Sequence, residues 1–402
     1  MKQGKVNIVL DAFWGSSGKG KVSTFLADRF GITKVSSSNF PNAGHSALFK
    51  DGTKFVAKAI PTAMILKKVK GTGIAGFISP GSGFFPKQLL KEWDQCGRPN
   101  LFIHSRASIV SAEHAERERS GSDSTKHIAS TMQGSGTAIS DKVMRREGII
   151  LAGTKPLTDW LIYLKVSDPE CAAILDGSGL EEAVEKIRVV DAMEFRNLFH
   201  SMMKAGETWL HEGSQGYALS IDHGSHYPNC TSRNCTVQAA MDHMAVPPAM
   251  VGDVYLNLRT HPIRVGNVVE DGVQKGYSGD FYPDCKEMTW EKVASDAGMP
   301  AGEAAALAER ERTTVTKRIR RVSSFSFIGL KDAVIVNGAT KLSLNFVQYL
   351  NWKDAGLRGG VEAVKLLSNE TREFIDNLET ITGIPVVLIG TGADHEDMID
   401  LL

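Results

Sequence analysis

The chain has 402 residues, in which 46 Lys and Arg balance 46 Asp and Glu, so its formal net charge is zero. This balance disfavours a general nucleic-acid binder, because such proteins usually carry a clear basic excess. Hydrophobic residues make up 42% of the chain, which excludes a disordered acidic tail protein. At this length a folded chain buries on the order of 70–75% of the surface that it exposes when unfolded, so we expect a large core.

The cysteine content indicates a reducing compartment. The five cysteines are odd in number and sparse, which argues against a framework of disulfides. No stretch approaches the roughly 18 apolar residues of a membrane helix, and no basic amphipathic face is found. The first apolar run ends at Asp11 and is too short for a signal peptide. We therefore expect a cytoplasmic protein that binds neither a membrane nor nucleic acid.

The first elements in chain order are a strand, a loop and a helix. Residues 6–10 form a short apolar run, which is typical of a buried parallel strand. A glycine-rich segment follows, and residues 22–30 then place their apolar side chains at helical spacing. The sequence thus predicts a P-loop-like strand–loop–helix start.

Apolar runs and helical stretches alternate along the rest of the chain, which favours an α/β fold around a mostly parallel sheet. Because no repeat or linker interrupts this pattern, we expect residues 1–402 to form a single large domain. Residues 71–83 and 121–136 are rich in Gly and Ser and are predicted to be long loops. The other predicted elements are strands at 101–103, 333–336 and 386–389 and helices at 301–311 and 361–380.

The glycine-rich segment carries the first chemical signal. It satisfies the pattern G-x-x-x-x-G-K, in which backbone N–H groups and a helix N-terminus hold phosphate groups. A complete P-loop continues with Ser or Thr as a magnesium ligand, whereas this chain has Val22. An ordinary glycine-rich turn is the alternative. The candidate phosphate-binding residues are Gly15, Ser16, Ser17, Gly18, Lys19, Gly20 and Lys21.

Six further strings follow the loop in order. They are 42–45 (NAGH), 134–146 (GSGTAISDKVMRR), 211–223 (HEGSQGYALSIDH), 313–321 (TTVTKRIRR), 340–342 (TKL) and 390–394 (GTGAD). Each string is weak alone, whereas the ordered set is specific. Together they resemble the adenylosuccinate synthetase family over nearly the whole chain. The resemblance implies a single large α/β domain around a long, mostly parallel sheet, and usually a homodimer.

The family reaction joins aspartate to C6 of a purine nucleotide. A nucleoside triphosphate first phosphorylates the 6-oxygen with the help of Mg²⁺, and the amine of aspartate then displaces phosphate. The resemblance implies that the glycine loop holds the triphosphate, while Lys341, Thr391 and Gly392 border its base. It assigns the metal to Ser16 and to the backbone carbonyl of Gly44.

The resemblance also implies sites for the other two substrates and a set of catalytic residues. The carboxylates of L-aspartate would suit the planar fork of arginine. His45 would act as an acid on the transferred phosphoryl group, and Ser16 and Gln215 complete the catalytic candidates. Aspartate would be held by Thr316, Arg318 and Arg320. The purine monophosphate would be held by Asn42, Thr131, Gln215, Thr231, Ser16 and, from the other subunit of a homodimer, Arg145.

Two acidic residues of the family loop, G-D-E-G-K-G-K, are replaced here by Ser16 and Ser17. The missing aspartate is the base that removes the N1 proton of hypoxanthine, and a serine hydroxyl is a poor base unless it is activated. Serine is also shorter, so it leaves space for the 2-amino group of guanine. This combination resembles the phage-type synthetases of the family, which make N6-succino-2-aminoadenine deoxynucleotide from dGMP. We therefore predict dGMP as the substrate. If the chain is phage-encoded, we expect the enzyme to act in the host cytoplasm.

A third replacement affects the phosphoryl donor. The family string T-K-L-D ends in an aspartate that accepts two hydrogen bonds from guanine, whereas this chain has Ser343. Losing such a bidentate pair removes on the order of 1–3 kcal/mol of base discrimination. We therefore predict ATP or dATP as the donor in place of GTP.

Several alternatives remain open at this stage. The chain could be an ordinary adenylosuccinate synthetase that uses IMP and GTP, or a nucleotide-binding regulator that has lost catalysis. The basic string 313–321 could be a solvated face or a nucleic-acid patch. The cluster His223, His226, Cys230 and Cys235 could be read as a zinc site, although its spacing is irregular.

Overall fold

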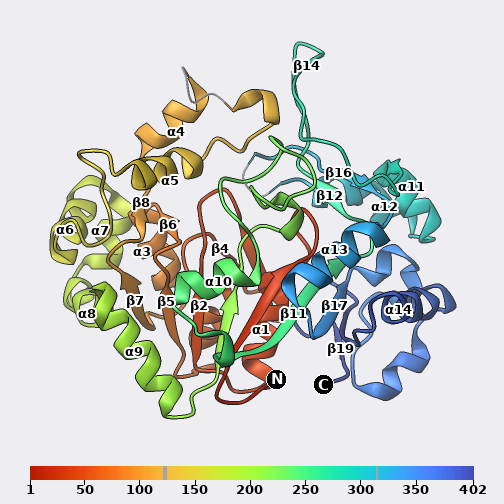
Figure 1. Ribbon diagram of the computed structural model, residues 1–402, viewed down its shortest axis with the longest axis horizontal. Coiled ribbons are helices and arrows are strands. Elements are labelled where there is room, and N and C mark those ends of the chain that lie inside the picture. The colour runs from red at the N-terminus through yellow and green to blue at the C-terminus, as the bar shows by residue number, and fades with distance from the viewer. Residues whose placement is uncertain (121–124, 314–315) are drawn as a thin grey trace.

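The computed structural model describes residues 1–120, 125–313 and 316–402 (Figure 1). Parts of the predicted loop 121–136 and of the string 313–321 therefore lie outside the described residues. No helix in the part of the chain that the structure describes is long and apolar enough to cross a membrane.

A ten-stranded sheet runs through the centre of the described chain. All of its neighbouring strands are parallel except the two strands at one edge that are last in the sequence, which pair antiparallel. The mostly parallel α/β architecture predicted from the sequence is confirmed. The spatial order is β19 (Met398–Asp400), β18 (Val386–Gly390), β17 (Lys341–Asn345), β11 (Val251–Arg259), β1 (Val6–Asp11), β10 (Trp209–Glu212), β2 (Lys34–Ser37), β5 (Ala75–Ile78), β7 (Asn100–His104) and β9 (Ile187–Val190).

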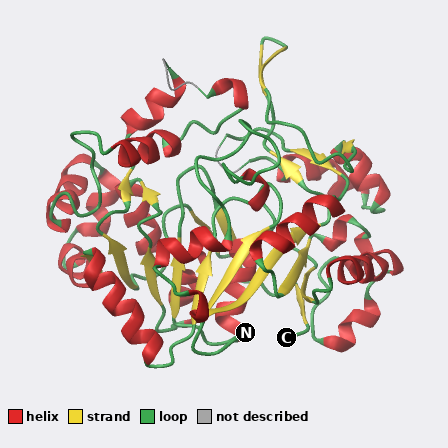
Figure 2. Ribbon diagram, viewed as in Figure 1, coloured by secondary structure: helices red, strands yellow, loops and turns green. Residues whose placement is uncertain are grey.

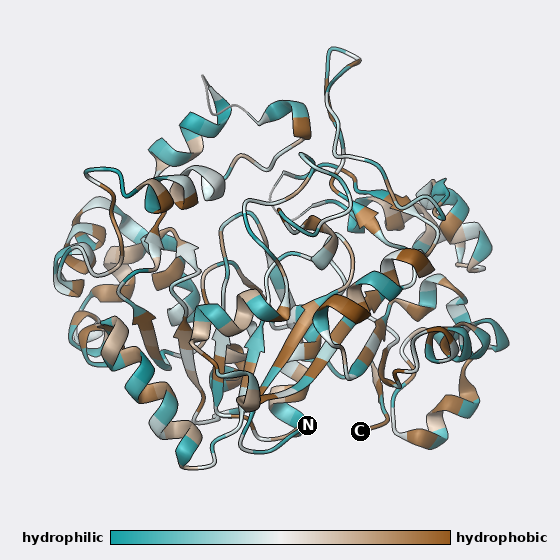
Figure 3. Ribbon diagram, viewed as in Figure 1, coloured by the Kyte–Doolittle hydropathy of each residue, from teal (hydrophilic) through white to brown (hydrophobic). Residues whose placement is uncertain are grey.

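Helices flank this sheet, and hydrophobic colouring concentrates on the central strands (Figures 2 and 3). Parallel strands are buried on both faces, which explains why β1 has no exposed residue. Two hydrophobic clusters divide the core, one containing Val9 and Leu26 and the other Ile8 and Leu330. The helices are α1 (Lys19–Arg29), α2 (Leu66–Lys70), α3 (Pro86–Gln95), α4 (Ala112–Arg119), α5 (Ser135–Met144), α6 (Leu157–Ser167), α7 (Pro169–Leu175), α8 (Gly179–Lys186), α9 (Ala192–Lys204), α10 (Val237–Met244), α11 (Trp290–Asp296), α12 (Ala301–Arg310), α13 (Phe327–Asn337) and α14 (Asn369–Thr382).

Small antiparallel and parallel ladders sit among the loops outside the sheet. One of them, with α11 and α12, forms a separate hydrophobic cluster around Trp290. These short strands are β3 (His45–Leu48), β4 (Lys54–Ala57), β6 (Gly83–Phe84), β8 (Ser108–Ile109), β12 (Ile263–Arg264), β13 (Val268–Glu270), β14 (Val273–Gly276), β15 (Glu287–Met288) and β16 (Arg321–Ser323).

The strand–loop–helix start is confirmed by β1 and α1, and β7, β18 and α12 also lie where the sequence predicts them. The predicted strand at 333–336 is wrong, because these residues lie inside α13. A short apolar run does not distinguish a buried strand from one face of a helix. Here Ser326 caps the helix through the N–H of Gly329, and Gly338 ends it in the left-handed region.

The predicted loop at 71–83 is also wrong in part, because it contains the central strand β5. Its Gly76 is a packing requirement, since a Cβ there would lie 2.2 Å from the sulfur of Met64. The predicted helix at 361–380 divides into a 3₁₀ segment, Val361–Leu366, and α14, whose N-cap is Ser368.

Candidate active site

The glycine loop leaves β1 at the carboxyl edge of the sheet and enters α1. Gly15, Ser16 and Gly18 adopt the left-handed backbone region, with φ of 92°, 56° and 89°. Glycine tolerates this region readily, whereas a serine there is strained. The hydroxyl-bearing residue Ser16 is exposed, while Ser17 and Lys19 are buried. Ser16 is thus the exposed residue of the loop, and it lies just before the N-terminus of α1, where a helix favours anions.

The two lysines of the loop have different partners. The ammonium of Lys19 lies 3.3 Å from Oδ2 of Asp11, and both side chains are buried. The other oxygen of Asp11 accepts hydrogen bonds from the N–H groups of Phe13 and Gly15. Asp11 therefore holds both the loop backbone and its first lysine in place.

Lys21 faces away from this pair. Its Nζ donates to the carbonyl oxygens of Gly392 and Asp397, each at 2.7 Å. Burial lowers the pKa of Lys21 to about 7, an effect that Asp397 and Asp394 oppose. The structure therefore places this predicted phosphate ligand between α1 and the 390–394 string, where it joins two predicted subsites.

His45 lies against the first turn of α1. A Cβ on Gly20 would come within 2.9 Å of the backbone of Ser46, so only glycine permits this approach. Nδ1 of His45 hydrogen-bonds to Oε1 of Glu212, which also accepts from the hydroxyl of Thr62 at 2.8 Å. Although burial raises the pKa of Glu212, His45 and Thr62 hold it below its ordinary value. A carboxylate that binds Nδ1 orients the imidazole and leaves Nε2 for a substrate.

Gln215 is brought to the glycine loop by a second close approach. A Cβ on Gly216 would lie 2.2 Å from the carbonyl oxygen of Phe13 and 2.6 Å from the nitrogen of Gly15. Gln215 itself adopts the left-handed region, with φ of 65°. The turn after β10 therefore packs directly against the loop after β1.

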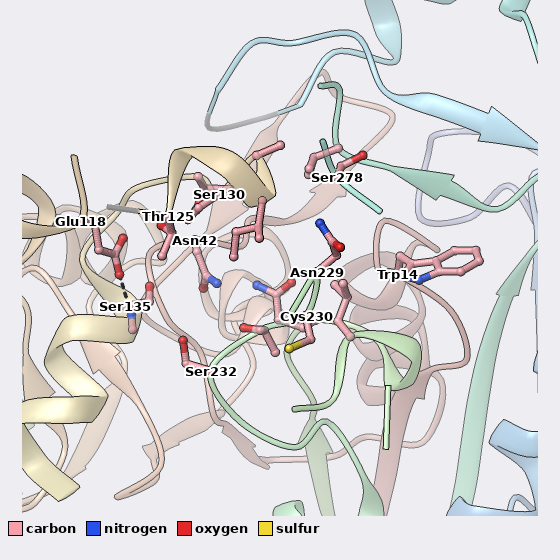
Figure 4. A pocket seen from close by; sticks show the side chains of 18 of the residues that line it. Trp14, Asn42, Glu118, Thr125, Ser130, Ser135, Asn229, Cys230, Ser232 and Ser278 are labelled. Atoms are coloured by element: carbon pink, nitrogen blue, oxygen red, sulfur yellow. Dashed lines mark hydrogen bonds between the residues drawn. The ribbon is translucent and has the colours of Figure 1, made fainter. Parts of the chain in front are cut away.

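A cavity of about 530 Å³ opens beside this turn. Trp14, just before the glycine loop, borders it, and Figure 4 shows Asn42 between the side chains from the α4–α5 region and those around Cys230. Four of the residues predicted to hold the purine monophosphate line this one cavity: Asn42, Thr131, Gln215 and Thr231. Ser16 is not among the residues that line the cavity, and neither is Arg145.

Arg145 lies at the exposed C-cap of α5, in the left-handed region. The adjacent apolar side chains Val143 and Met144 are 67% and 64% exposed. Arg145 is exposed and does not line the cavity of its own chain.

The predicted aspartate-binding residues Thr316, Arg318 and Arg320 do not line the cavity, but Arg318 contacts a loop that does. Arg318 donates to the carbonyl oxygens of Ala129 and Ser130, at 3.0 and 3.1 Å, and to the hydroxyl of Thr316. Ala129 and Ser130 line the cavity together with Thr131. Arg320 pairs with Glu311 at 3.3 Å. These arginines turn inward, which disfavours a nucleic-acid patch.

The residues predicted to border the base of the triphosphate lie on β17 and in the segment that follows β18. Lys341, Ser343 and Asn345 alternate along β17 and therefore share one face of the strand. Ser343 is fully buried, and its hydroxyl accepts from Nδ2 of Asn345 at 3.4 Å. Thr391 follows β18 and is buried, and Gly392 receives the hydrogen bond from Lys21.

A metal ion finds few protein ligands here. Within residues 1–120, 125–313 and 316–402, no three His, Cys, Asp or Glu side chains gather into a metal cluster. Burial raises the pKa of the Cys235 thiol to about 11, which disfavours the thiolate that zinc requires. Mg²⁺ needs less, because it keeps several waters and binds substrate phosphates with one or two protein oxygens. The exposed hydroxyl of Ser16 and the carbonyl of Gly44, just before β3, fit that small donor set.

Sequence reasoning missed the residues that support this site. Each of them is a buried side chain that holds another part of the site, and all except Asp11 pair with a distant part of the chain. Glu212 offers a signal, since it lies within the string 211–223 and ends the buried strand β10. The residues are Asp11, Thr62, Glu212, Arg259 and Glu311.

Comparison with known proteins finds relatives that share one family. A family model described as adenylosuccinate synthetase matches residues 8–355. The N6-succino-2-amino-2'-deoxyadenylate synthase of Vibrio phage phiVC8 is 30% identical over 87% of this chain and 88% of its own length. The protein with the same name from Salmonella phage PMBT28 is 33% identical, with 86% of each chain covered. An adenylosuccinate synthetase from Thermococcus onnurineus is 30% identical over 98% of this chain and 97% of its own.

Two solved structures share the fold. The succinoaminodeoxyadenylate synthetase of cyanophage S-2L, described as bound to dGMP and dATP as an energy donor, has a TM-score of 0.74 and 27% identity. The match covers 99% of this chain and 96% of that chain. The adenylosuccinate synthetase of Plasmodium falciparum has a TM-score of 0.76 at 18% identity and covers 98% and 99%, which speaks for the fold alone.

Proposed function

The chain belongs to the adenylosuccinate synthetase family, as its ordered motifs predict, and we propose that it joins L-aspartate to dGMP. ATP or dATP would drive the reaction through a 6-phosphoryl intermediate, and the product would be N6-succino-2-amino-2'-deoxyadenylate. One observation carries the proposal. Asn42, Thr131, Gln215 and Thr231 line one cavity beside a phosphate loop that has Ser16 where the family has aspartate.

The choice of dGMP over IMP rests on Ser16 and on the relatives. Guanine has an amino group at C2 where hypoxanthine has hydrogen, and a serine leaves room for it that an aspartate would fill. The serine hydroxyl can also accept a hydrogen bond from that amino group. The phage relatives at 30% and 33% identity carry the name of this activity, and the cyanophage structure is described with dGMP bound.

The first chemical step would be transfer of a phosphoryl group to the 6-oxygen of the purine. Catalysis of such a transfer is mostly positioning and charge stabilisation, since charge spreads over the transferred oxygens. The N-terminus of α1 and the loop N–H groups would hold the phosphates, with Lys19 released from Asp11 to meet them. His45, oriented by Glu212, would donate a proton or hydrogen bond from Nε2 to the transferred group.

The second step would be attack of the aspartate amine at C6, with phosphate as the leaving group. Arg318 and Arg320 would bind the two carboxylates of aspartate, and Arg318 already touches the loop that carries Thr131. This contact would place the amine beside the purine cavity. Holding two reactants in this way replaces a collision by a step within one complex.

The donor site would favour adenine because the family aspartate that accepts hydrogen bonds from guanine is replaced by Ser343. Ser343 is buried on β17 and has one hydroxyl in place of a bidentate carboxylate. It cannot accept from both N1–H and the 2-amino group of guanine. The cyanophage structure, described with dATP as an energy donor, supports the same choice.

Magnesium is the cofactor that this chemistry implies, and Ser16 and the Gly44 carbonyl are the residues that would hold it. When bound, Mg²⁺ neutralises charge on the phosphates. A homodimer would complete the site, because Arg145 is exposed beside Val143 and Met144 and does not line its own cavity. The exposed apolar side chains fit burial against a second copy.

The test is a phosphate-release assay with each substrate omitted in turn and the product identified by mass spectrometry. We expect release that requires L-aspartate, dGMP and ATP together, and a product heavier than dGMP by one aspartate less one water. Nucleotide binding without such release would identify a regulator that has lost catalysis and would refute the proposal.

A further inference from the structure

We propose that Arg259 is a positioning residue that couples aspartate binding to the phosphate loop. It lies at the end of β11, in the strand next to β1, and its side chain is only 2% exposed. Its guanidinium contacts two separate segments of the site. The inference rests on the proposed function, because it takes Arg320 to bind aspartate and the loop to bind triphosphate.

The first contact of Arg259 is with the glycine loop. Its Nη1 donates to the carbonyl oxygen of Ser16 at 3.1 Å. Ser16 adopts the left-handed region, with φ of 56°, which is strained for an L-residue other than glycine. A hydrogen bond from a buried charged donor to this peptide favours the strained geometry. Arg259 therefore helps to set where the Ser16 hydroxyl is presented.

The second contact is with Glu311, just before the aspartate loop. Nη2 of Arg259 lies 3.0 Å from Oε1 of Glu311, and Nη1 of Arg320 lies 3.3 Å from Oε2 of the same carboxylate. The backbone N–H of Arg320 also donates to the carbonyl oxygen of Glu311. One buried carboxylate thus joins the two arginines, and Tyr349 donates to it at 2.9 Å.

The surroundings keep this bridge dry and fixed. The guanidinium carbon of Arg259 lies 4.2 Å from the ring centre of Phe346 and 5.9 Å from that of Trp290. Aromatic faces stabilise a desolvated cation and restrict its position. Charges interact strongly away from water. A change in the other ion pair of Glu311 therefore alters its interaction with Arg259.

The consequence follows from the sharing of one carboxylate. When aspartate binds Arg320, the substrate carboxylate competes for that guanidinium, and Glu311 then interacts more with Arg259. Arg259 in turn fixes the carbonyl of Ser16 and so the loop that holds the triphosphate. Aspartate and triphosphate should therefore tighten each other's binding, by the same factor in both directions.

The test measures binding without turnover. The dissociation constant of L-aspartate is determined by calorimetry in the presence of dGMP, with and without a non-hydrolysable ATP analogue. We expect the analogue to tighten aspartate binding about tenfold in the wild type, within the usual range of such coupling. In R259K and in E311Q we expect less than about a twofold effect, since lysine cannot bridge two acceptors as a planar fork does. R98K is the matched control, because Arg98 pairs with Asp94 and Glu182 outside the site.

The outcomes separate the two claims. A wild type that binds no L-aspartate would refute the proposed function itself. A wild type that binds it, with a coupling factor near one or a factor unchanged in R259K and E311Q, would overturn the coupling alone. Thermal melting of R259K and E311Q checks that each variant is folded. If one of them does not melt cooperatively, the other alone is compared with the wild type.

Discussion

The carboxylate of Glu212 binds Nδ1 of His45 across two elements that are 167 positions apart in the sequence. Glu212 ends β10 in the central sheet, whereas His45 begins the small strand β3 outside it. Thr62 fixes the carboxylate through its hydroxyl and its N–H. The orientation of the candidate acid is therefore set by the core of the molecule.

Replacing Glu212 by glutamine should lower kcat and leave the KM for dGMP nearly unchanged. The imidazole loses the carboxylate charge that orients it, and general acid–base groups contribute on the order of 10²–10⁴-fold. We expect a fall in kcat on the order of a hundredfold. Thr62→Val, which removes only one donor to the carboxylate, should have a smaller effect. An unchanged kcat in a folded E212Q protein would show that the pair has no catalytic role.

The stability of the protein should fall in mild acid, in part through His211. Burial lowers the pKa of His211 to about 4, and the ring contacts Ser36 across the sheet. The unfolded chain binds a proton near pH 6.5, so stability that is present above this pH is lost as the pH falls toward 4. This one group accounts for roughly 3 kcal/mol of that loss.

The measurement is the free energy of unfolding in urea at several values between pH 7 and pH 4. His211→Gln should flatten the dependence, whereas replacement of the exposed His200 should leave it as in the wild type. Parallel curves for wild type and the His211 variant would count against the assignment.

Restoring the acidic residue at position 343 should restore the use of GTP. Ser343→Asp would supply two acceptor oxygens on the buried face of β17, and a bidentate pair is worth about 1–3 kcal/mol of discrimination. We expect kcat/KM for GTP relative to ATP to rise at least about tenfold. Ser343→Ala, measured alongside, should keep the preference for ATP. If both variants prefer the same donor as the wild type, the base is read elsewhere.

A shared site in a homodimer should permit complementation between inactive variants. Arg145→Ala leaves each cavity without the partner's arginine, and His45→Asn removes the acid from each cavity. Mixed dimers of the two variants contain one site with an intact His45 and an intact Arg145 from the partner. We expect partial activity when the two inactive proteins are mixed and allowed to exchange subunits. No recovery on mixing, with exchange verified, would contradict the shared site.

The sequence predicts the parts of this site that are local. The strand–loop–helix start follows from an apolar run, glycines and helical spacing. The ordered strings contain Asn42 and Gln215, the family resemblance adds Thr131 and Thr231, and all four line one cavity. The residues that hold these groups in place could not be found in the same way. Arg259 meets Ser16 only because β11 pairs with β1, and this register is a property of the folded sheet. Lys21 is a different case. Its motif predicts a phosphate ligand, whereas in the folded chain its side chain donates to the carbonyl oxygen of Gly392.

The same limit explains the errors in the elements. Residues 333–336 form an apolar run that fits a strand, yet Ser326 and Gly338 set the bounds of a helix around it. Residues 71–83 look like a loop because of their glycines, yet Gly76 serves the packing of β5 against Met64. In both cases the deciding information lies in a cap or a neighbour outside the run.

The substrate choice is the central claim, and parallel steady-state kinetics with dGMP and IMP test it most directly. Both are measured with saturating L-aspartate, ATP and Mg²⁺, as kcat/KM for each monophosphate. The account predicts that dGMP is preferred by at least about tenfold, or 1.4 kcal/mol of transition-state stabilisation. It also predicts that Ser16→Asp narrows or reverses the ratio. A wild-type preference for IMP would contradict the account.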